Sequence, residues 1–286
     1  MHGLLSGGRA GGSAYLDRRG PAALAHRGGG AEVAENSRAA LEHVDALGYR
    51  YLETDVRRTA DGVVVLHHDP TLDRTTNGHG PLSALTWAQA ARLRDRAGGR
   101  LVRLDEALAD FPRLRLNIDL KEDGVVGPAL HTIAEAGAHD RVCLASFSDR
   151  RLQVVRRVTQ GRVATSLAMQ ETARLVLSAT LGVPARGVPT PSGPPTERAV
   201  AVQVPVRYRG IPVVTPAFVR LAHRLGLEVH VWTVDDAPSM HRLLDLGVDG
   251  LVTDRPTALR AVLRARGQWY EDVPGARGST HLPGEV

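Results

Sequence analysis

Short strand-like runs and helical patterns alternate along most of this 286-residue chain. The predicted strands are residues 22–26, 50–56, 114–120, 141–146, 162–168, 200–204, 228–233 and 249–253. Because eight strands that alternate with helices close into a parallel barrel, this order predicts a (β/α)8 TIM barrel. A doubly wound open sheet is the alternative, but no strand is followed by the GxGxxG fingerprint of that fold.

The domain limits follow from the same pattern. Predicted helices span residues 37–47, 86–94, 104–110, 148–158, 171–182, 215–226, 236–246 and 256–266. A hairpin and short helices at about 62–103 form a small insertion after the second strand, and residues 184–196 read as a surface loop. We therefore expect a loose N-terminal leader at 1–20, a barrel at 21–266 and a flexible tail at 267–286.

Composition narrows the class of protein. With 43% apolar and 23% charged residues, the chain is typical of a globular domain with a sizeable core. The single cysteine, Cys143, excludes a disulfide framework and is expected to be a buried small apolar residue. No apolar run approaches the roughly 20 residues of a membrane span, and residues 1–20 lack the apolar core of a signal peptide. The sequence therefore predicts a cytoplasmic protein.

The net charge of +5 does not indicate a nucleic-acid partner. The arginines are scattered through every segment, and aromatic residues are only 4% of the chain, too few for an obvious platform for stacked bases. A basic balance of this kind reflects general arginine usage, with some attraction for anionic substrates.

Acidic residues and histidines are concentrated between Tyr51 and Thr76. Glu53 and Asp55 lie two positions apart, so a strand would place both carboxylates on one face, where they require a cation or a wet cleft. A second strand-like run leads directly into His67 and His68. This stretch predicts metal-assisted or acid–base chemistry.

A second polar row comes from residues 114–121, LRLNIDLK, in which apolar and polar residues alternate. Asn117, Asp119 and Lys121 share one face, and in a barrel that face can line the central cleft. Lys121 is the only lysine of the chain, which suggests a place where a compact ammonium group is needed.

The carboxyl ends of barrel strands carry the catalytic groups, and here they bring polar side chains together. Three carboxylates offer hard oxygen ligands for Mg²⁺ or Ca²⁺, two basic side chains could hold an anion, and two histidines could serve as base and acid. The alternative is a purely structural role, in which the charged side chains form internal salt bridges and the histidine is a buried core residue. The residues are His26, Arg27, Glu53, Asp55, His68, Asp119 and Lys121.

Several motifs in this order resemble the glycerophosphodiester phosphodiesterase family, within the phosphatidylinositol-phospholipase-C-like phosphodiesterases. They are HRG at 26–28, ENS at 35–37, ETDV at 53–56, DGVVVLHHDPTLDRTTNG at 61–78, NIDLK at 117–121, SF at 146–147, WTVD at 232–235 and GVDGLVTDRP at 247–256. The resemblance implies a (β/α)8 barrel that hydrolyses glycerophosphodiesters to an alcohol and glycerol 3-phosphate with Ca²⁺ or Mg²⁺.

Carried over by position, the resemblance assigns roles to eight residues. It implies His26 and His68 as the acid–base pair, with His68 preferred to His67 because it directly precedes an aspartate. It implies metal ligands at Glu53, Asp55 and Asp119, phosphate contacts at Arg27 and Lys121, and an apolar wall at Trp232. Glu35 and Asn36 are expected to support the end of the first strand.

The sequence departs from the family pattern at two points. Asp119 stands where the family usually has a glutamate, and the block AENS at 34–37 lacks the family's proline. A related phosphodiesterase of the lysophospholipase D or sphingomyelinase D type is an alternative, disfavoured because no apolar patch is evident in the loops. A non-catalytic anion-binding barrel is another, disfavoured by the retained histidines and carboxylates. A homodimer is left open.

Overall fold

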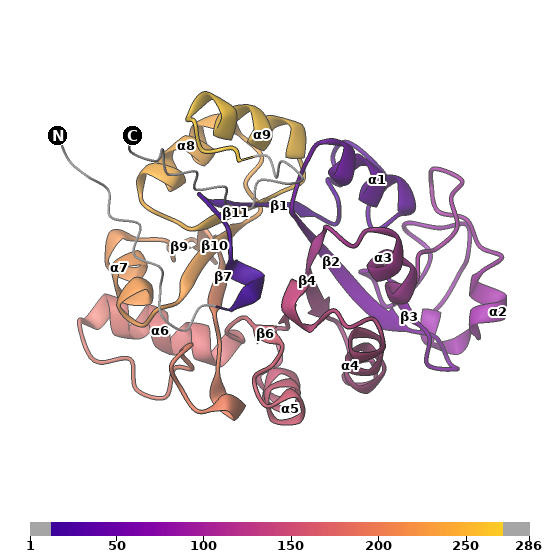
Figure 1. Ribbon diagram of the computed structural model, residues 1–286, viewed down its shortest axis with the longest axis horizontal. Helices are drawn as coiled ribbons and strands as arrows, with labels where there is room; N and C mark the ends of the chain where they lie inside the picture. The colour runs from indigo at the N-terminus through magenta and orange to yellow at the C-terminus, as the bar shows by residue number, and fades with distance from the viewer. Residues whose placement is uncertain (1–12, 271–286) are drawn as a thin grey trace, which may run out of the picture.

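The computed structural model describes residues 13–270, and within them eight parallel strands form a barrel (Figure 1). The barrel strands are β1 (Ala22–His26), β2 (Tyr51–Arg58), β4 (Arg115–Leu120), β5 (Val142–Ala145), β6 (Ala164–Thr165), β7 (Ala201–Pro205), β10 (Glu228–Trp232) and β11 (Gly250–Thr253). They pair in the order β6-β5-β4-β2-β1-β11-β10-β7, and a parallel bridge between Ser166 and Ala201 joins the two ends of this order. The predicted (β/α)8 barrel is confirmed.

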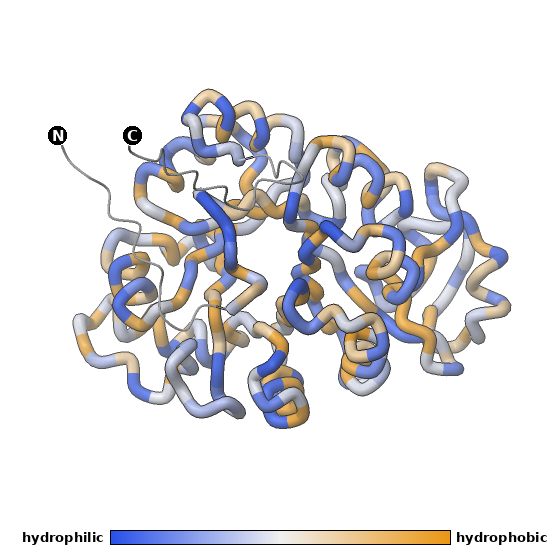
Figure 2. Tube along the Cα trace, viewed as in Figure 1, coloured by the Kyte–Doolittle hydropathy of each residue, from blue (hydrophilic) through white to orange (hydrophobic). Residues whose placement is uncertain are grey.

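Helices surround the barrel on its outside (Figure 1). They are α1 (Arg38–Ala46), α3 (Leu104–Asp110), α4 (Val126–Glu135), α5 (Asp149–Thr159), α6 (Met169–Leu181), α7 (Pro216–Arg224), α8 (Ala237–Asp245) and α9 (Pro256–Ala265). All but α4 lie where helices are predicted, and α4 completes the alternation after β4. Apolar and polar positions alternate around these helices (Figure 2), so each packs one face on the strands and leaves the other to solvent.

Strand register brings the polar residues of three neighbouring strands side by side. Glu53 of β2 is the partner of His26 on β1 and of Asn117 on β4, and Asp55 is the partner of Asp119. Because side chains alternate along a strand, the intervening Leu52 and Ile118 point outward into the core between the barrel and the helices. The register therefore places the carboxylates on the inner face of the barrel.

The insertion after β2 has a small core of its own. β3 (Val64–Leu66) pairs antiparallel with β2, as the hairpin motif predicts, and the short helix α2 (Trp87–Ala90) follows. The predicted helix at 86–94 is too long, because Asn77 exchanges hydrogen bonds with the backbone of Arg94 and draws the chain into a turn. The insertion's own cluster consists of Val65, Leu72, Leu82, Ala90 and Leu101.

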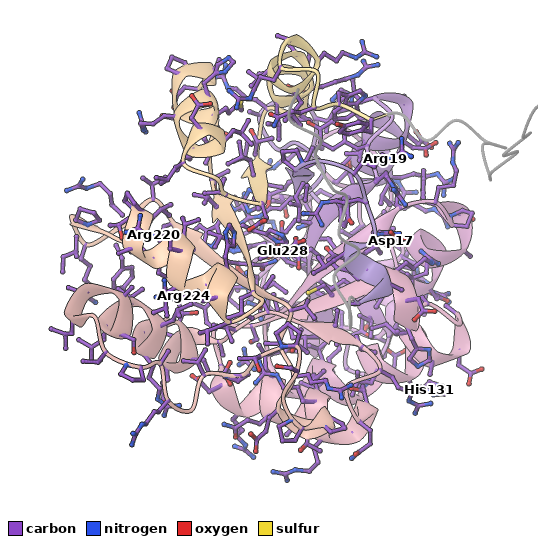
Figure 3. The ribbon with its side chains drawn as sticks, turned by 60° about the vertical axis from the view of Figure 1, so that its left-hand side comes forward. Asp17, Arg19, His131, Arg220, Arg224 and Glu228 are labelled. Carbon is purple, nitrogen blue, oxygen red and sulfur yellow. The ribbon has the colours of Figure 1, made fainter. Side chains whose placement is uncertain are left out.

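The N-terminal segment corrects an expectation. The sequence predicts a loose segment at residues 1–20, but residues 13–20 pack against the amino-terminal ends of the strands. Tyr15 is fully buried and its ring meets Tyr51 edge-on at 5.2 Å. Arg18 forms a 2.7 Å ion pair with Glu228 of β10, which lies inside the barrel; Figure 3 labels Glu228 and Asp17, the neighbour of Arg18. This segment closes the end of the barrel opposite the site.

The other end of the described chain also packs. Of the expected flexible tail at 267–286, Trp269 meets the ring of Tyr49 edge-on at 5.0 Å. Residues 1–12 and 271–286 lie outside the described residues, so the remainder of the predicted leader and tail is not tested. Within residues 13–270, no helix has the length and apolar character needed to cross a bilayer.

Candidate active site

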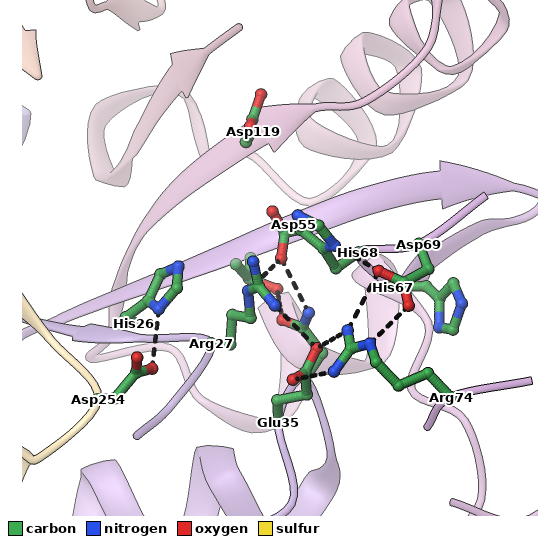
Figure 4. Close-up of polar contacts among 12 residues, drawn as sticks. His26, Arg27, Glu35, Asp55, His67, His68, Asp69, Arg74, Asp119 and Asp254 are labelled. Atoms are coloured by element: carbon green, nitrogen blue, oxygen red, sulfur yellow. Dashed lines mark hydrogen bonds and ion pairs between the residues drawn. The ribbon is translucent and has the colours of Figure 1, made fainter. Parts of the chain in front are cut away.

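One cavity at the carboxyl end of the barrel contains every site residue that the sequence predicts. Its volume is about 710 Å³. The predicted residues that line it are His26, Arg27, Glu53, Asp55, His68, Asp119, Lys121 and Trp232. Figure 4 shows most of them meeting from β1, β2, β4 and the end of the β3 hairpin. The tertiary fold thus brings together groups that span more than two hundred positions of the chain.

The two predicted catalytic histidines have the same arrangement. Nδ1 of His26 lies 2.8 Å from Oδ1 of Asp254, and Nδ1 of His68 lies 2.6 Å from Oδ1 of Asp69 (Figure 4). When each Nδ1–H donates to its carboxylate, the imidazole is fixed in one tautomer and Nε2 keeps its lone pair. Each histidine can therefore take up or release a proton at Nε2.

His67 is separated from this chemistry. It is buried, and its Nε2 lies 3.0 Å from the carbonyl oxygen of Thr71, within the insertion. Burial lowers the pKa of the His67 imidazole. Because neighbouring residues point in opposite directions, only His68 of the pair lines the cavity. The sequence preference for His68 agrees with this geometry.

Asp55 is the most heavily contacted carboxylate of the site. Its Oδ1 lies 2.8 Å from Nζ of Lys121, and its Oδ2 lies 3.1 Å from Nε of Arg27. Asn36 donates from Nδ2 to the same Oδ2 at 3.1 Å and accepts from Thr54, so it fixes the carboxylate orientation. Burial opposes ionisation, but the two cations outweigh burial and lower the pKa of Asp55. The ionised form of Asp55 is therefore favoured by the two cations beside it.

Glu53 is in a different electrostatic position. Burial, together with the charge of Asp55, raises the pKa of the Glu53 carboxyl to about 7. Its Oε2 accepts a hydrogen bond from the backbone nitrogen of Arg27 at 3.1 Å and lies 3.7 Å from Nε2 of His26. Burial alone would lower the pKa of His26, but the bond to Asp254 and the charge of Glu53 raise it.

The predicted metal ligands do not form a closed ligand set in this arrangement. Nζ of Lys121 lies between two of them, 2.6 Å from Asp119 and 2.8 Å from Asp55. Among residues 13–270, no three His, Cys, Asp or Glu side chains lie close enough together to hold an ion as they stand. The chemistry of the donors still fits a hard cation, because Glu53, Asp55 and Asp119 present carboxylate oxygens from one wall of the cavity.

Four residues at the site have no catalytic role in the sequence-based prediction. Asp254 and Asp69 orient the two histidines, and Arg74 binds Asp69 at 2.6 Å and Glu35 at 2.7 Å. Glu35 also pairs with Arg27 at 3.0 Å, so it links the β1 end to the hairpin (Figure 4). The aspartates of the HD and TDRP motifs were visible signals, but only the fold shows that each faces a histidine.

The opposite side of the cavity is apolar. Trp232 meets the ring of Phe147 edge-on at 6.2 Å, and helix α6 and the hairpin β8 (Arg207–Tyr208) to β9 (Ile211–Pro212) continue this side. Phe147 is 56% exposed and Ile211 is 65% exposed. The expectation that the loops carry no apolar patch is therefore wrong, because residues distant in sequence gather only at the cavity rim.

Comparison with known proteins settles the family. The model of the glycerophosphoryl diester phosphodiesterase family matches residues 26–258. The chain belongs to this family. A relative named probable glycerophosphodiester phosphodiesterase 2, from Mycobacterium tuberculosis, is 38% identical over 89% of this chain and 95% of its own length. A human lysophospholipase D is 25% identical over 84% of this chain and 85% of its own length.

Solved structures of the family share the barrel. A putative glycerophosphoryl diester phosphodiesterase from Silicibacter pomeroyi superposes with a TM-score of 0.73 at 22% identity, over 91% of this chain and 100% of its own. A phosphodiesterase from Oleispira antarctica, solved with the product sn-glycerol-3-phosphate, superposes with a TM-score of 0.70 at 21% identity, over 88% of this chain and 100% of its own. These likenesses support the fold assignment of this family member.

Proposed function

We propose that this protein hydrolyses glycerophosphodiesters to an alcohol and glycerol 3-phosphate, with His26 and His68 as its acid–base pair. Family membership and the 38% identical relative named for this activity support the reaction class. The observation that carries the catalytic assignment is the matched pair of carboxylate-bound histidines. Both line one cavity, and each keeps Nε2 available for proton transfer.

In the proposed reaction, one histidine removes a proton from the attacking oxygen through Nε2. A new P–O bond forms as the P–O bond to the leaving alcohol breaks, and the second histidine protonates the departing alkoxide. The attacker is water or the 2-hydroxyl of the glycerol. Attack by the hydroxyl forms a cyclic phosphate, which water then opens with the roles of the two histidines exchanged.

Arg27 and Lys121 are proposed to hold the phosphate. Both cations line the cavity, and each is anchored to Asp55 from the side, at 3.1 and 2.8 Å. Anchored cations stabilise the charge that develops on the phosphoryl oxygens without having to reorganise during the reaction. Trp232, on the apolar side, is proposed to form a wall for the glycerol or the leaving group.

A divalent cation, Mg²⁺ or Ca²⁺, is proposed to be held by Glu53, Asp55 and Asp119. When bound, it would supply positive charge for the phosphoryl oxygens. Nζ of Lys121 lies between Asp55 and Asp119, so a bound ion would share these two carboxylates with the ammonium group. The placement of three carboxylates on one wall of the cavity, with Asp55 and Asp119 paired in strand register, supports this proposal.

The acid–base assignment is tested with glycerophosphocholine as substrate. His26→Ala and His68→Ala are each expected to lose roughly 10²- to 10⁴-fold in kcat, the range of acid–base contributions. His131→Ala, an exposed histidine on α4, is the matched control and should keep wild-type turnover. Near wild-type kcat for correctly folded His68→Ala would refute the assignment.

The cation is tested separately by chelation and by heat. Removal of divalent ions should abolish turnover, and Mg²⁺ or Ca²⁺ should restore it. The thermal midpoint should rise with ion concentration in the wild type and not in Glu53→Gln. An unchanged midpoint together with full activity in chelator would refute the cation site.

Other expectations stay predictions. A cytoplasmic location, the lack of a nucleic-acid partner and the open question of a homodimer require fractionation, a binding assay and a mass measurement in solution. A non-catalytic anion-binding barrel is the remaining alternative of a different class, and the turnover assay decides it directly.

A further inference from the structure

Acidic residues are almost missing from one part of the chain. Between Glu171 and Glu228 the sequence contains seven arginines and one acidic residue, Glu197, so the net charge of this stretch is +6. The rest of the chain holds the other 29 of the 36 basic residues and the other 30 of the 31 acidic residues. The arginines are spread along the whole chain, but their counterions are not. The positive balance of the protein therefore comes from this stretch.

A groove between helices α6 and α7 collects three of these arginines. The two helices lie side by side on the outside of the barrel (Figure 1), and Figure 3 labels Arg220 and Arg224 on α7. The volume of the groove is about 540 Å³, which is in the range of small-molecule sites. Arg186, from the loop after α6, lines it together with Arg220 and Arg224, and no acidic residue does.

The three arginines have no partner within the described part of the chain. No ion pair or side-chain hydrogen bond joins any of them to another residue between positions 13 and 270. Arg220 and Arg224 lie four positions apart on α7, where like charges repel each other. The dipole of α7 favours a cation in its last turn, which explains Arg224 but neither Arg220 nor Arg186. An anion bound in the groove would relieve this repulsion.

The surface between the arginines is largely apolar. Ala179, Val183, Leu221 and Leu225 line the groove together with them. Guanidinium groups bind phosphate oxygens through paired N–H donors, and apolar side chains suit the carbon part of a ligand. This combination favours an organic phosphate over a bare inorganic ion.

We propose that the groove between α6 and α7 binds a small soluble organic phosphate that carries two or three negative charges. Three unpaired guanidinium groups match the charge of a phosphomonoester or a diphosphate. This groove and the cavity that contains His26 and His68 share no lining residue. The proposal therefore does not depend on the proposed reaction.

Titration calorimetry in buffer without divalent ions tests the site. The probes are pyrophosphate and glycerol 3-phosphate. At least one of them should bind to the wild type, and Arg220→Gln and Arg224→Gln should each weaken this binding by about tenfold or more. Both variants should keep the wild-type turnover of glycerophosphocholine measured without added anion. A lack of binding by both probes would overturn the proposal.

Two further variants locate the bound anion. Arg157→Gln is the matched control, because Arg157 is exposed in the last turn of α5, as Arg224 is in the last turn of α7, and does not line the groove. It should bind the probes as the wild type does, and a loss equal to that of Arg224→Gln would contradict the assignment. Arg27→Gln removes a cation of the catalytic cavity and should keep the binding in the groove. Binding that Arg27→Gln abolishes and the α7 variants retain would place the anion in the catalytic cavity and overturn the proposal.

Vesicles distinguish a soluble ligand from a lipid headgroup. At physiological ionic strength the protein should stay in solution with phosphatidylglycerol vesicles as it does with neutral phosphatidylcholine vesicles. Sedimentation with phosphatidylglycerol that Arg220→Gln and Arg224→Gln reduce and that pyrophosphate does not reverse would identify a membrane headgroup. That result would overturn the proposal of a soluble ligand.

Discussion

Nδ1 of His26 lies 2.8 Å from Oδ1 of Asp254, although 228 positions separate the two residues. β1 and β11 are neighbours in the barrel, so the first and last units of the fold meet at this hydrogen bond. His68 has the same kind of partner in the next residue, Asp69. The site therefore contains two histidines that are each bound to an aspartate through Nδ1. Adjacent residues form one of these pairs, and closure of the barrel forms the other.

Replacing Asp254 with asparagine should shift the pH profile of the enzyme to the acid side. Burial lowers the pKa of His26, and the Asp254 and Glu53 carboxylates raise it above its ordinary value. Without the charge at 254, the imidazole loses its proton at lower pH. Whether His26 acts as acid or base, its limb of the kcat/KM profile moves to lower pH.

The measurement is kcat/KM for glycerophosphocholine between about pH 5 and 9. Asp140→Asn, near the start of β5 at the far end of the barrel, is the control and should leave the profile in place. A shift of the Asp254→Asn profile toward higher pH would contradict the role assigned to this carboxylate.

The adjacent histidines should respond differently to alanine substitution. His68→Ala should remove activity with little effect on stability, because its side chain is one-third exposed. His67→Ala should lower the free energy of unfolding by about 1–3 kcal/mol, because it leaves a buried space and an unpaired carbonyl at Thr71. Denaturant unfolding and kcat are measured for both. The reverse pattern would show that the wrong histidine faces the substrate.

Lys121→Met should destabilise the protein and increase its stabilisation by Mg²⁺. It leaves Asp55 and Asp119 without the ammonium group that now lies between them, at a cost of about 3 kcal/mol in unfolding free energy. Mg²⁺ should raise the thermal midpoint of this variant more than that of the wild type, because the ion replaces the missing charge. An unaltered midpoint in the absence of metal would contradict this prediction.

Tyr15→Ala should destabilise the barrel without changing its chemistry. Tyr15 is fully buried beneath the strands, so the loss is about 3–5 kcal/mol, as for other large aromatic truncations. Tyr15→Phe is the matched control and should be nearly neutral, since the Tyr15 hydroxyl has no hydrogen-bond partner among residues 13–270. Calorimetry measures both, and kcat of the folded Tyr15→Ala protein should equal that of the wild type.

The local pattern was sufficient to predict the barrel and the wall of the site that carries the charges. Strand alternation placed Glu53 and Asp55 on one face and allowed only one of His67 and His68 to face the site, and the family resemblance selected His68. Such inferences succeed because the two-residue period of a strand is a property of the backbone itself. Such inferences fail where a segment shows no regular alternation of apolar and polar residues. Residues 13–20 are an example, because their burial depends on Tyr51 and Glu228, which lie far along the chain.

The tertiary structure alone decided which groups contact each other. The residues next to His26 in the sequence do not show that its partner is Asp254, and those next to Lys121 do not show that it lies between two carboxylates. Only the fold shows that helix α6 and the exposed side chains of Tyr208 and Ile211 line the same cavity. These relationships arise because barrel closure fixes the distance between strand ends that the sequence holds far apart. The sequence determined which chemical groups the site has, and the closed barrel determined their partners, their charges and the apolar half of the cavity.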